Sequence, residues 1–302
     1  MKTNNILAVG TVATDNVKTP AGEVKKALGG SVSYFAAAAR FFSKVSVVAV
    51  VGEDFPPKYF KLLKGLKIDT SGIEVRKGKT FSWSGFYGED LNQARTLETQ
   101  LNVLASFDPI LSPKHKKSKV VFLANIDPAI QLAVLRQVKS PTLTACDTMN
   151  YWIDTKLHRL RQLLRKVDIF LCNDAEAKQL SGLKNLLAAS RWLMRHGPKI
   201  VIIKKGEHGV VCASRDFTFM APAYWVPKVL DPTGAGDAFA GGFVGFLAKA
   251  KRLNEGAIRQ AVIYGSVLAS YNVESFSLHR LVSLKMPQIR SRYKDFKALT
   301  RF

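Results

Sequence analysis

The sequence predicts a doubly wound α/β fold: a mostly parallel sheet with helices on both faces, accompanied by a small β lid. Short, almost continuously apolar runs alternate with helical patterns, and two polar, β-prone stretches interrupt this alternation. Strands made almost entirely of apolar residues are buried on both faces, which is typical of parallel sheets between layers of helices. The 302 residues suffice for one domain of this kind, which we expect to span residues 1–302.

The elements follow in order along the chain. Six apolar runs are expected to form strands of the main sheet: residues 6–10, 45–52, 119–126, 142–147, 167–172 and 200–205. Helical patterns lie between several of them, at 33–42, 127–138 and 185–196. Two β-like runs around a turn, 209–214 and 217–222, predict an antiparallel pair at one edge. A further strand-like run, 223–230, should end near Leu230, and the last third of the chain is expected to be helical.

The two polar stretches lie near residues 13–26 and 76–100. We expect them to form a small sheet beside the main one, which would close as a lid over the ends of its strands. Long surface loops are the alternative for both stretches. No linker separates the sequence into two full domains.

The formal net charge of +22 and the three cysteines limit the classes of function. No zinc-finger spacing or aromatic-basic RNA-binding pattern accompanies the basic residues, so we expect only weak, non-specific binding to nucleic acid, with a contribution from the basic segment 280–302. The cysteines are distant in sequence, as expected for reduced thiols of a cytoplasmic protein. No signal peptide and no run of about 18 apolar residues is present, which predicts no membrane partner.

The stretch DPTGAGDAF, residues 231–239, is the strongest functional signal. Glycine is a poor helix former, yet these glycines stand where a helix should begin, near Gly234 or Ala235. The first N–H groups of a helix lack internal partners, and small residues let an anion approach them. Residues 233–236 are therefore expected to bind an anion through their backbone N–H groups, and we call them the anion cradle. The nearby Asp237 carboxylate is expected to accept a proton from a hydroxyl group. Alternatively, Asp237 only complements the helix dipole.

The same stretch closely resembles the C-terminal signature of the ribokinase-like (PfkB) carbohydrate and nucleoside kinases, and further motifs of that family follow over nearly the whole chain. The resemblance implies the ribokinase-like fold. It also implies that Asp237 is the catalytic base and that the amides of Gly234, Ala235 and Gly236 form the anion hole. Nucleotide contacts from Thr233, Gly234 and Gly236 follow from the same comparison.

The N-terminal part of the chain resembles the family's substrate pocket. Gly29 and Gly30 look like its Gly-Gly signature, and Asp15 matches an aspartate that binds substrate hydroxyls in many members. The resemblance therefore implies substrate contacts from Asp15, Gly29 and Gly30, together with Asp237. An ordinary polar loop residue is the alternative for Asp15. The family's asparagine after the two glycines is absent, because residues 33–35 read Ser-Tyr-Phe, and the identity of the substrate stays open.

Two pairs of residues resemble cation sites of the family. Asn173 and Glu176 match its N-x-x-E motif, which implies that they order Mg²⁺ and its waters around the nucleotide phosphates. On spacing alone the same pair fits a helix capping box, with Asn at the N-cap and Glu three residues later. Asp231 and Thr233 match positions that hold a monovalent cation, such as K⁺, in some members.

The loop at residues 204–209, KKGEHG, resembles the family's nucleotide loop T-x-G-x-x-G, with Lys204 in place of the common threonine. The resemblance implies nucleotide contacts from Lys204, Gly206 and Gly209. A glycine-bearing hairpin turn is the alternative. Asp147 and the nearby Asn150 match a further segment that lies close to the path of the phosphates in the family.

Together these motifs predict an ATP-dependent kinase that transfers the γ-phosphate to a hydroxyl of a small carbohydrate. A nucleoside kinase of the same family is the alternative. The alternative from another class is a non-catalytic nucleotide-sensing or nucleic-acid-associated protein, against which the intact cradle and base argue. We expect ATP, a sugar or nucleoside, and Mg²⁺ at the site, with K⁺ at the second cation position. The sequence also allows a homodimer.

Overall fold

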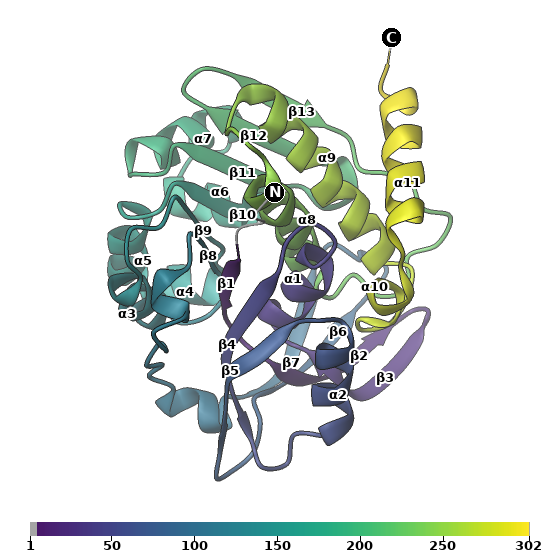
Figure 1. Ribbon diagram of the computed structural model, residues 1–302. Coiled ribbons are helices and arrows are strands. Elements are labelled where there is room, and N and C mark those ends of the chain that lie inside the picture. Colours follow the sequence, from purple (N-terminus) through teal and green to yellow (C-terminus); the bar gives the residue numbers. More distant parts are fainter. Residues whose placement is uncertain (1–4, 302) are drawn as a thin grey trace.

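The computed structural model describes residues 5–301. Its main element in this range is an open sheet of nine strands (Figure 1). The strands follow the order β13-β12-β11-β10-β9-β8-β1-β4-β5. All pairs from β11 to β5 are parallel, and β12 and β13 form the antiparallel pair at one edge. The strands are β1 (Ile6–Val9), β4 (Val45–Gly52), β5 (Asp69–Arg76), β8 (Val120–Leu123), β9 (Leu143–Cys146), β10 (Ile169–Asn173), β11 (Ile200–Lys204), β12 (Val210–Ser214) and β13 (Thr218–Ala221).

Helices cover both faces of this sheet, which confirms the doubly wound fold. One face carries α1 (Ser31–Ala39), α2 (Pro57–Gly65), α8 (Ala235–Lys249), α9 (Glu255–Asn272), α10 (His279–Ser283) and α11 (Met286–Leu299). The other carries α3 (Pro128–Gln137), α4 (Asn150–Thr155), α5 (Leu157–Leu164), α6 (Asp174–Ser181) and α7 (Leu186–Arg195). Successive residues of β4 enter different cores, Val47 the first and Val48 the second, so the strand is apolar on both sides. Within the described residues, no helix is both long and apolar enough to cross a membrane.

The glycines inside α8 let the helix pack closely against its neighbours. A Cβ atom on Gly241 would lie 2.4 Å from the Phe35 carbonyl oxygen of α1, and one on Gly242 would lie 2.7 Å from the Tyr264 carbonyl oxygen of α9. Phe239 and Phe243 are buried, as their spacing of four residues predicts. This packing fixes the direction of α8 and thereby the position of its N-terminus.

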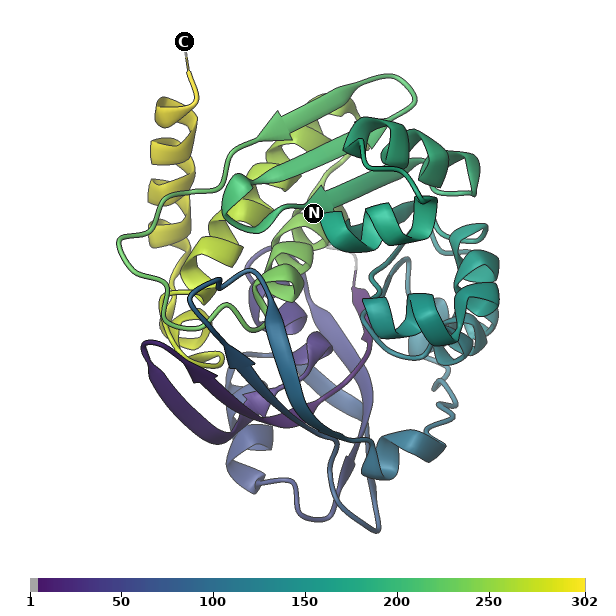
Figure 2. The same cartoon turned by 180° about the vertical axis from the view of Figure 1, so that it is seen from behind.

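The two polar stretches do form a separate sheet of four strands, in the order β3-β2-β6-β7. It lies to one side of the main sheet, as the purple and blue hairpins show in the view from behind (Figure 2). Its strands are β2 (Ala13–Thr19), β3 (Gly22–Gly29), β6 (Ser82–Tyr87) and β7 (Ala94–Gln100). Strand β3 extends beyond the expected limit, residue 26, and ends at the first glycine of the Gly-Gly pair.

One expected strand is absent, and one strand of the structure was not predicted. Residues 223–230 form no strand, because Pro227 lacks an N–H group to donate and the neighbouring Trp225 is 88% exposed, so the run is not buried. Conversely, β5 (Asp69–Arg76) was not predicted. It is an edge strand with polar residues at several positions and therefore lacks the apolar run that marks the inner strands.

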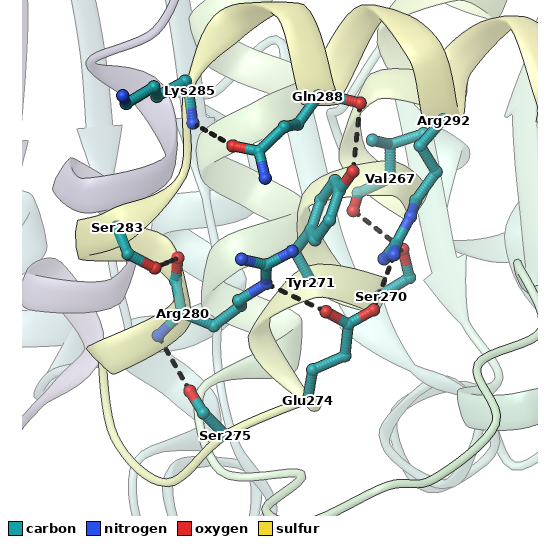
Figure 3. A network of polar contacts seen from close by, with 10 residues as sticks. All are labelled: Val267, Ser270, Tyr271, Glu274, Ser275, Arg280, Ser283, Lys285, Gln288 and Arg292. Carbon is teal, nitrogen blue, oxygen red and sulfur yellow. Dashed lines mark hydrogen bonds and ion pairs between the residues drawn. The ribbon is translucent and has the colours of Figure 1, made fainter.

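The C-terminal helices are fixed to the end of α9 through the Glu274 carboxylate (Figure 3). Glu274 accepts hydrogen bonds from Arg280 at 3.0 Å and from Arg292 at 2.6 Å. The guanidinium carbon of Arg292 lies 3.4 Å from the centroid of the Tyr271 ring, and the Tyr271 hydroxyl donates to the Gln288 carbonyl. Two arginines of the basic segment 280–302 therefore make internal contacts, and their charges are partly neutralised by Glu274.

Candidate active site

Three neighbouring parallel strands end in polar side chains at one edge of the main sheet. Asp147 follows β9 directly, Asn173 ends β10 and Lys204 ends β11. Asn173 and Lys204 are partners in the β10–β11 register. The carboxyl ends of parallel strands meet at the same edge, which is where open α/β sheets bind ligands. The structure thus brings together three residues that are separated by up to 57 positions in sequence.

The expected anion cradle lies at the N-terminus of α8. Gly234 has a φ of +74°, a left-handed conformation that glycine adopts without strain. Within residues 5–301, the N–H groups of Gly236 and Asp237 have no acceptor, whereas the Ala235 N–H donates to the Pro232 carbonyl at 3.1 Å. These free amides lie at the positive end of the helix dipole and are available to an anion.

The loop that leads into the cradle is held by the turn after α9. Asn272 Nδ2 donates to the Thr233 carbonyl at 2.8 Å, and the Ser277 amide donates to Asp231 Oδ2 at 3.1 Å. Asp231 Oδ1 accepts from the Thr233 amide at 2.9 Å. Ser277 also donates from its hydroxyl to the Leu28 carbonyl, next to the Gly-Gly pair. These contacts join the cradle to the N-terminal substrate region.

Asp237, the expected base, lies in the first turn of α8 with an altered acidity. Burial, followed by the negative charge of Asp147, raises the pKa of Asp237 to about 8, although Lys204 lowers it and Asp15 and Glu176 raise it slightly further. A carboxylate with a raised pKa is a stronger proton acceptor once it is ionised. The position and the chemistry both fit a general base.

The expected substrate residues Asp15, Gly29 and Gly30 are adjacent in space. A Cβ atom on Gly29 would overlap the Asp15 carboxylate, and one on Gly30, where φ is +89°, would lie 2.3 Å from the Thr11 carbonyl oxygen. The two glycines therefore make room for Asp15 and for a close turn of the backbone. Asp15 Oδ1 is buried and has no partner among the described residues. Burial raises the pKa of Asp15 to about 7, against the effect of a hydrogen bond from the Gly30 amide.

Two tyrosines belong to this region and were not expected there. The Tyr34 ring lies directly against Gly234, where a Cβ atom would be 2.3 Å from the ring. Tyr34 stands in the region where the family has its asparagine, and that departure was the signal in the sequence. The Thr233 hydroxyl donates to the Tyr87 hydroxyl at 3.4 Å, so the small sheet reaches the cradle. Burial raises the pKa of Tyr87 to about 12, so both phenols are neutral.

Asn173 and Glu176 form a complete capping box at the start of α6. Asn173 Oδ1 accepts from the Glu176 amide and Glu176 Oε2 accepts from the Asn173 amide, each at 2.7 Å. Glu176 is buried, and its burial raises the pKa to about 7, against the opposing effect of Lys204. The described residues hold no group of three or more His, Cys, Asp or Glu side chains that could enclose a metal ion. Carboxylate oxygens such as those of Glu176 are ligands that Mg²⁺ accepts, directly or through its waters.

Several oxygen atoms lie near the second cation position, Asp231 and Thr233. Asp231 is buried, and burial raises its pKa. Asn272 Oδ1 is buried and has no partner among residues 5–301. The loop before α8 is held by the backbone N–H groups that donate to Asp231 and by the side-chain NH₂ group of Asn272, which donates to the Thr233 carbonyl. The side-chain oxygen of Asn272 makes no hydrogen bond within residues 5–301 and could contact a cation.

The loop 204–209 is a tight turn between the antiparallel strands β11 and β12, as the hairpin alternative has it. The Lys205 amide donates to the Gly209 carbonyl at 2.8 Å, and Gly206 and Gly209 have φ values of +55° and +84°. Asn92, in the turn between β6 and β7, lies so close that a Cβ on Gly206 would overlap its side chain, and Asn92 donates to Glu207 at 3.2 Å. The tip of the small sheet therefore touches this turn.

Asn150 does not join the group around Asp147. It begins α4, is exposed, and its side chain accepts from the Tyr151 amide. Asp147 itself is buried beside Lys204. Of Asp147 and Asn150, only Asp147 contacts Lys204.

A mostly parallel sheet of this order, with free amides at the start of α8, Asp237 beside them and further carboxylates at the same edge, is the arrangement expected of a ribokinase-like phosphotransferase. The comparisons with known proteins agree: residues 4–282 match the model of the pfkB family of carbohydrate kinases. The chain belongs to this family. It is therefore an ATP-dependent kinase whose acceptor is a hydroxyl group of a sugar or nucleoside.

Relatives and solved structures of the family are similar over most of the chain. The cytidine kinase of Thermococcus kodakarensis is 30% identical over 256 residues, which are 83% of this chain and 91% of the relative. The nucleoside kinase of Methanocaldococcus jannaschii is 25% identical over 76% of this chain and 73% of its own, and its crystal structure superposes with a TM-score of 0.78, covering 97% and 98% of the two chains. A putative ribokinase II from E. coli, in complex with ATP and Mg²⁺, has a TM-score of 0.81 at 17% identity, covering 97% and 99%.

Proposed function

We propose that this protein phosphorylates a primary hydroxyl of a nucleoside at the expense of ATP. The observation that carries the proposal is the half-buried Asp237 carboxylate beside the free amides of Gly236 and Asp237, with Asp15 near enough for its charge to raise the pKa of Asp237. A small sugar was the first expectation from the sequence. Three relatives match more than three quarters of the chain: the cytidine kinase at 30% identity, the nucleoside kinase at 25% and an ATP-dependent 6-phosphofructokinase of Thermoanaerobacterium thermosaccharolyticum at 24%. The two with the higher identities favour the nucleoside. The ribose of a nucleoside presents the same kind of hydroxyl to the base.

The residues act as follows in this proposal. Asp15, with its free buried oxygen, accepts a hydrogen bond from a ribose hydroxyl beside Gly29 and Gly30. Asp237 takes the proton of the primary hydroxyl while that oxygen attacks the γ-phosphorus. The bond from the γ-phosphorus to the β,γ-bridging oxygen breaks and ADP leaves. The amides at the start of α8 stabilise the negative charge on the transferring group.

Asn173 and Glu176 would hold Mg²⁺ through its water shell, and capping of α6 does not compete with this role, because only one Glu176 oxygen makes the capping bond. When bound, Mg²⁺ neutralises charge on the phosphates. Asp231, the Thr233 carbonyl and Asn272 would surround a monovalent cation, K⁺ being the expected one. Both assignments rest on the oxygen atoms at these positions and on the family motifs.

The small sheet acts as a lid in this proposal. Its strands carry Asp15 and Tyr87, and the turn after Tyr87 touches the 204–209 turn through Asn92. The nucleotide would be contacted by Lys204, Gly206 and Gly209 of the 204–209 turn. The aromatic residues of β6, Trp83 among them, are available for stacking on the base of the nucleoside. The three buried free cysteines suit a reducing compartment, and we place the enzyme in the cytoplasm.

The test is a phosphorylation screen of nucleosides and free sugars with ATP and Mg²⁺, run on the wild type and on Asp237→Asn. We expect transfer to a nucleoside that is about 10²–10⁴ times slower in the variant, because the general base is lost. Binding of ATP, measured by calorimetry, should stay within about threefold. If the wild type phosphorylates sugars and no nucleoside, the acceptor is a sugar and the nucleoside proposal is wrong. If Asp237→Asn is as fast as the wild type, Asp237 is not the base.

A further inference from the structure

Lys204 occupies a central position in the candidate site. It is the last residue of β11, next to Asn173 on β10, and it reaches across to Asp147, which follows β9. Its side chain is 17% exposed and that of Asp147 is 4% exposed. Of the lysines whose ion pairs the structure describes, Lys204 is therefore enclosed to an unusual degree, and the place that encloses it is the carboxyl edge of the sheet.

The ammonium group of Lys204 makes a short ion pair and stays charged. Its Nζ donates to Asp147 Oδ2 at 2.6 Å. Burial alone would lower the pKa of Lys204, but the negative charges of Asp147 and Glu176 outweigh burial and raise it. A buried ion pair contributes little to stability on average, because desolvation of both charges offsets their attraction. Stabilisation of the fold is therefore a weak explanation for the charged Lys204 at this buried position.

The same ammonium group lies against the anion cradle. A Cβ atom on Gly236 would be only 3.1 Å from Lys204 Nζ, so the glycine leaves the room that the ammonium occupies. The Gly236 and Asp237 amides beside it have no acceptor within the described residues. Two neutral donors and one cation thus face the same small volume.

We propose that Lys204 is a catalytic residue, whose ammonium group binds an oxygen of the γ-phosphoryl group during its transfer. Asp147 is the positioning residue that holds the ammonium beside the cradle. The family motif has a threonine here, which can donate one neutral hydrogen bond, whereas a lysine adds a full positive charge. This inference rests on the proposed phosphotransferase function and extends it by one residue.

The role in the reaction follows from the charge. As the acceptor oxygen approaches and the bond to the bridging oxygen of ADP lengthens, charge is distributed over the oxygens of the γ-phosphoryl group. The Lys204 ammonium and the two amides are already oriented toward that charge, so they need no rearrangement in the transition state. Lys204 donates hydrogen bonds throughout and transfers no proton; the proton of the acceptor goes to Asp237.

The experiment compares Lys204→Met, which keeps the length and removes the charge, with Lys204→Arg, which keeps the charge. Lys199→Met is the matched control. Lys199 stands just before the same strand, β11, and pairs with Asp168 at 2.8 Å, far from the cradle. We expect kcat to fall by about 10²–10³ in Lys204→Met, as for loss of one donor to a transition-state oxyanion. Lys204→Arg should recover part of it, and Lys199→Met should match the wild type.

A binding measurement without any acceptor makes the result independent of the substrate. Calorimetry with Mg²⁺ and ADP, with and without aluminium fluoride as a mimic of the transferring group, gives the affinity gained from the mimic. Lys204→Met should bind ADP within about threefold of the wild type and lose most of that gain. An unchanged gain and an unchanged kcat, with only a lower unfolding temperature, would show a structural ion pair and overturn the proposal. Should the wild type phosphorylate neither sugars nor nucleosides, the proposed function fails, while the calorimetric test of Lys204 still stands.

Discussion

Replacing Glu176 by Gln removes one negative charge from the active site and keeps the helix cap. The Glu176 side chain accepts one hydrogen bond from the Asn173 amide at 2.7 Å, and the amide oxygen of Gln can accept the same bond. Loss of the cap is therefore not expected to lower the folding stability of Glu176→Gln. A residue that holds a metal through an outer shell contributes about 10–100-fold to metal affinity. We expect the Mg²⁺ concentration for half-maximal rate to rise by that factor.

The dependence on pH adds a second measurement on the same pair of proteins. The pKa of Glu176 is about 7 in the folded protein without metal, above its ordinary value of 4.5, because the side chain is buried. Only the ionised form attracts Mg²⁺, so the wild type should require more Mg²⁺ as the pH falls from 8 to 6. Glu176→Gln should lose this contribution. The effect on folding stability has the opposite dependence on pH. The folded state binds the Glu176 proton more tightly than the unfolded state does, so the contribution of Glu176 to the free energy of unfolding falls as the pH rises from 4.5 to 7.

The assay is a titration of the initial rate with Mg²⁺ at several pH values, combined with thermal unfolding. Asn185→Ala is the matched control, because Asn185 caps α7 by accepting from the Ala188 amide at 2.9 Å and lies outside the site. It should lose about 1 kcal/mol of stability without any change in the Mg²⁺ requirement. Identical Mg²⁺ titrations for Glu176→Gln and the wild type would refute the metal role and leave Glu176 as a cap alone.

Three further outcomes are expected. Trp83 fluorescence should change on adding the acceptor and little with ATP alone, and Trp83→Phe should remove the signal; a signal that persists in this variant would mean that β6 is not part of a lid. Exchanging K⁺ for tetramethylammonium should slow transfer if a cation lies beside Asp231, and an equal rate in both salts would exclude it. Binding to unrelated DNA and RNA should be weak and fall steeply with salt, given the net charge of +22; tight, sequence-selective binding at physiological salt would contradict this.

The main sheet and the cradle could be predicted because both leave local patterns. Apolar runs identify strands that are buried on both faces, and the glycines of DPTGAGDAF identify the start of α8, which begins at Ala235 as expected. The edge strand β5 could not be found in this way, since polar residues interrupt its sequence and leave no continuous apolar run. The strand predicted at residues 223–230 is absent. An apolar run in a sequence does not reveal whether it is buried, and Trp225 in this run is largely exposed.

Contacts between distant segments were beyond prediction from local patterns. Lys204 and Asp147 were both noted in the sequence, but nothing there indicates that β9, β10 and β11 are neighbours and so bring the two side chains within 2.6 Å. The basic C-terminal segment illustrates the same limit. Its count of charges is visible in the sequence, but the count does not reveal that Arg280 and Arg292 are held by Glu274 from the preceding turn.

The attachment of the cradle to the turn after α9 has a consequence for the newly made protein. Ser277 joins Asp231 to the Leu28 carbonyl, so the first and last parts of the chain meet at the site. A ribosome adds about 5–20 residues per second, and the substrate region around Gly30 is therefore exposed for about 10–60 s before Ser277 is made. Chains that stop before this residue lack the anchor of the cradle. Catalytic competence should thus appear only at the end of translation, and fragments released earlier should be inactive.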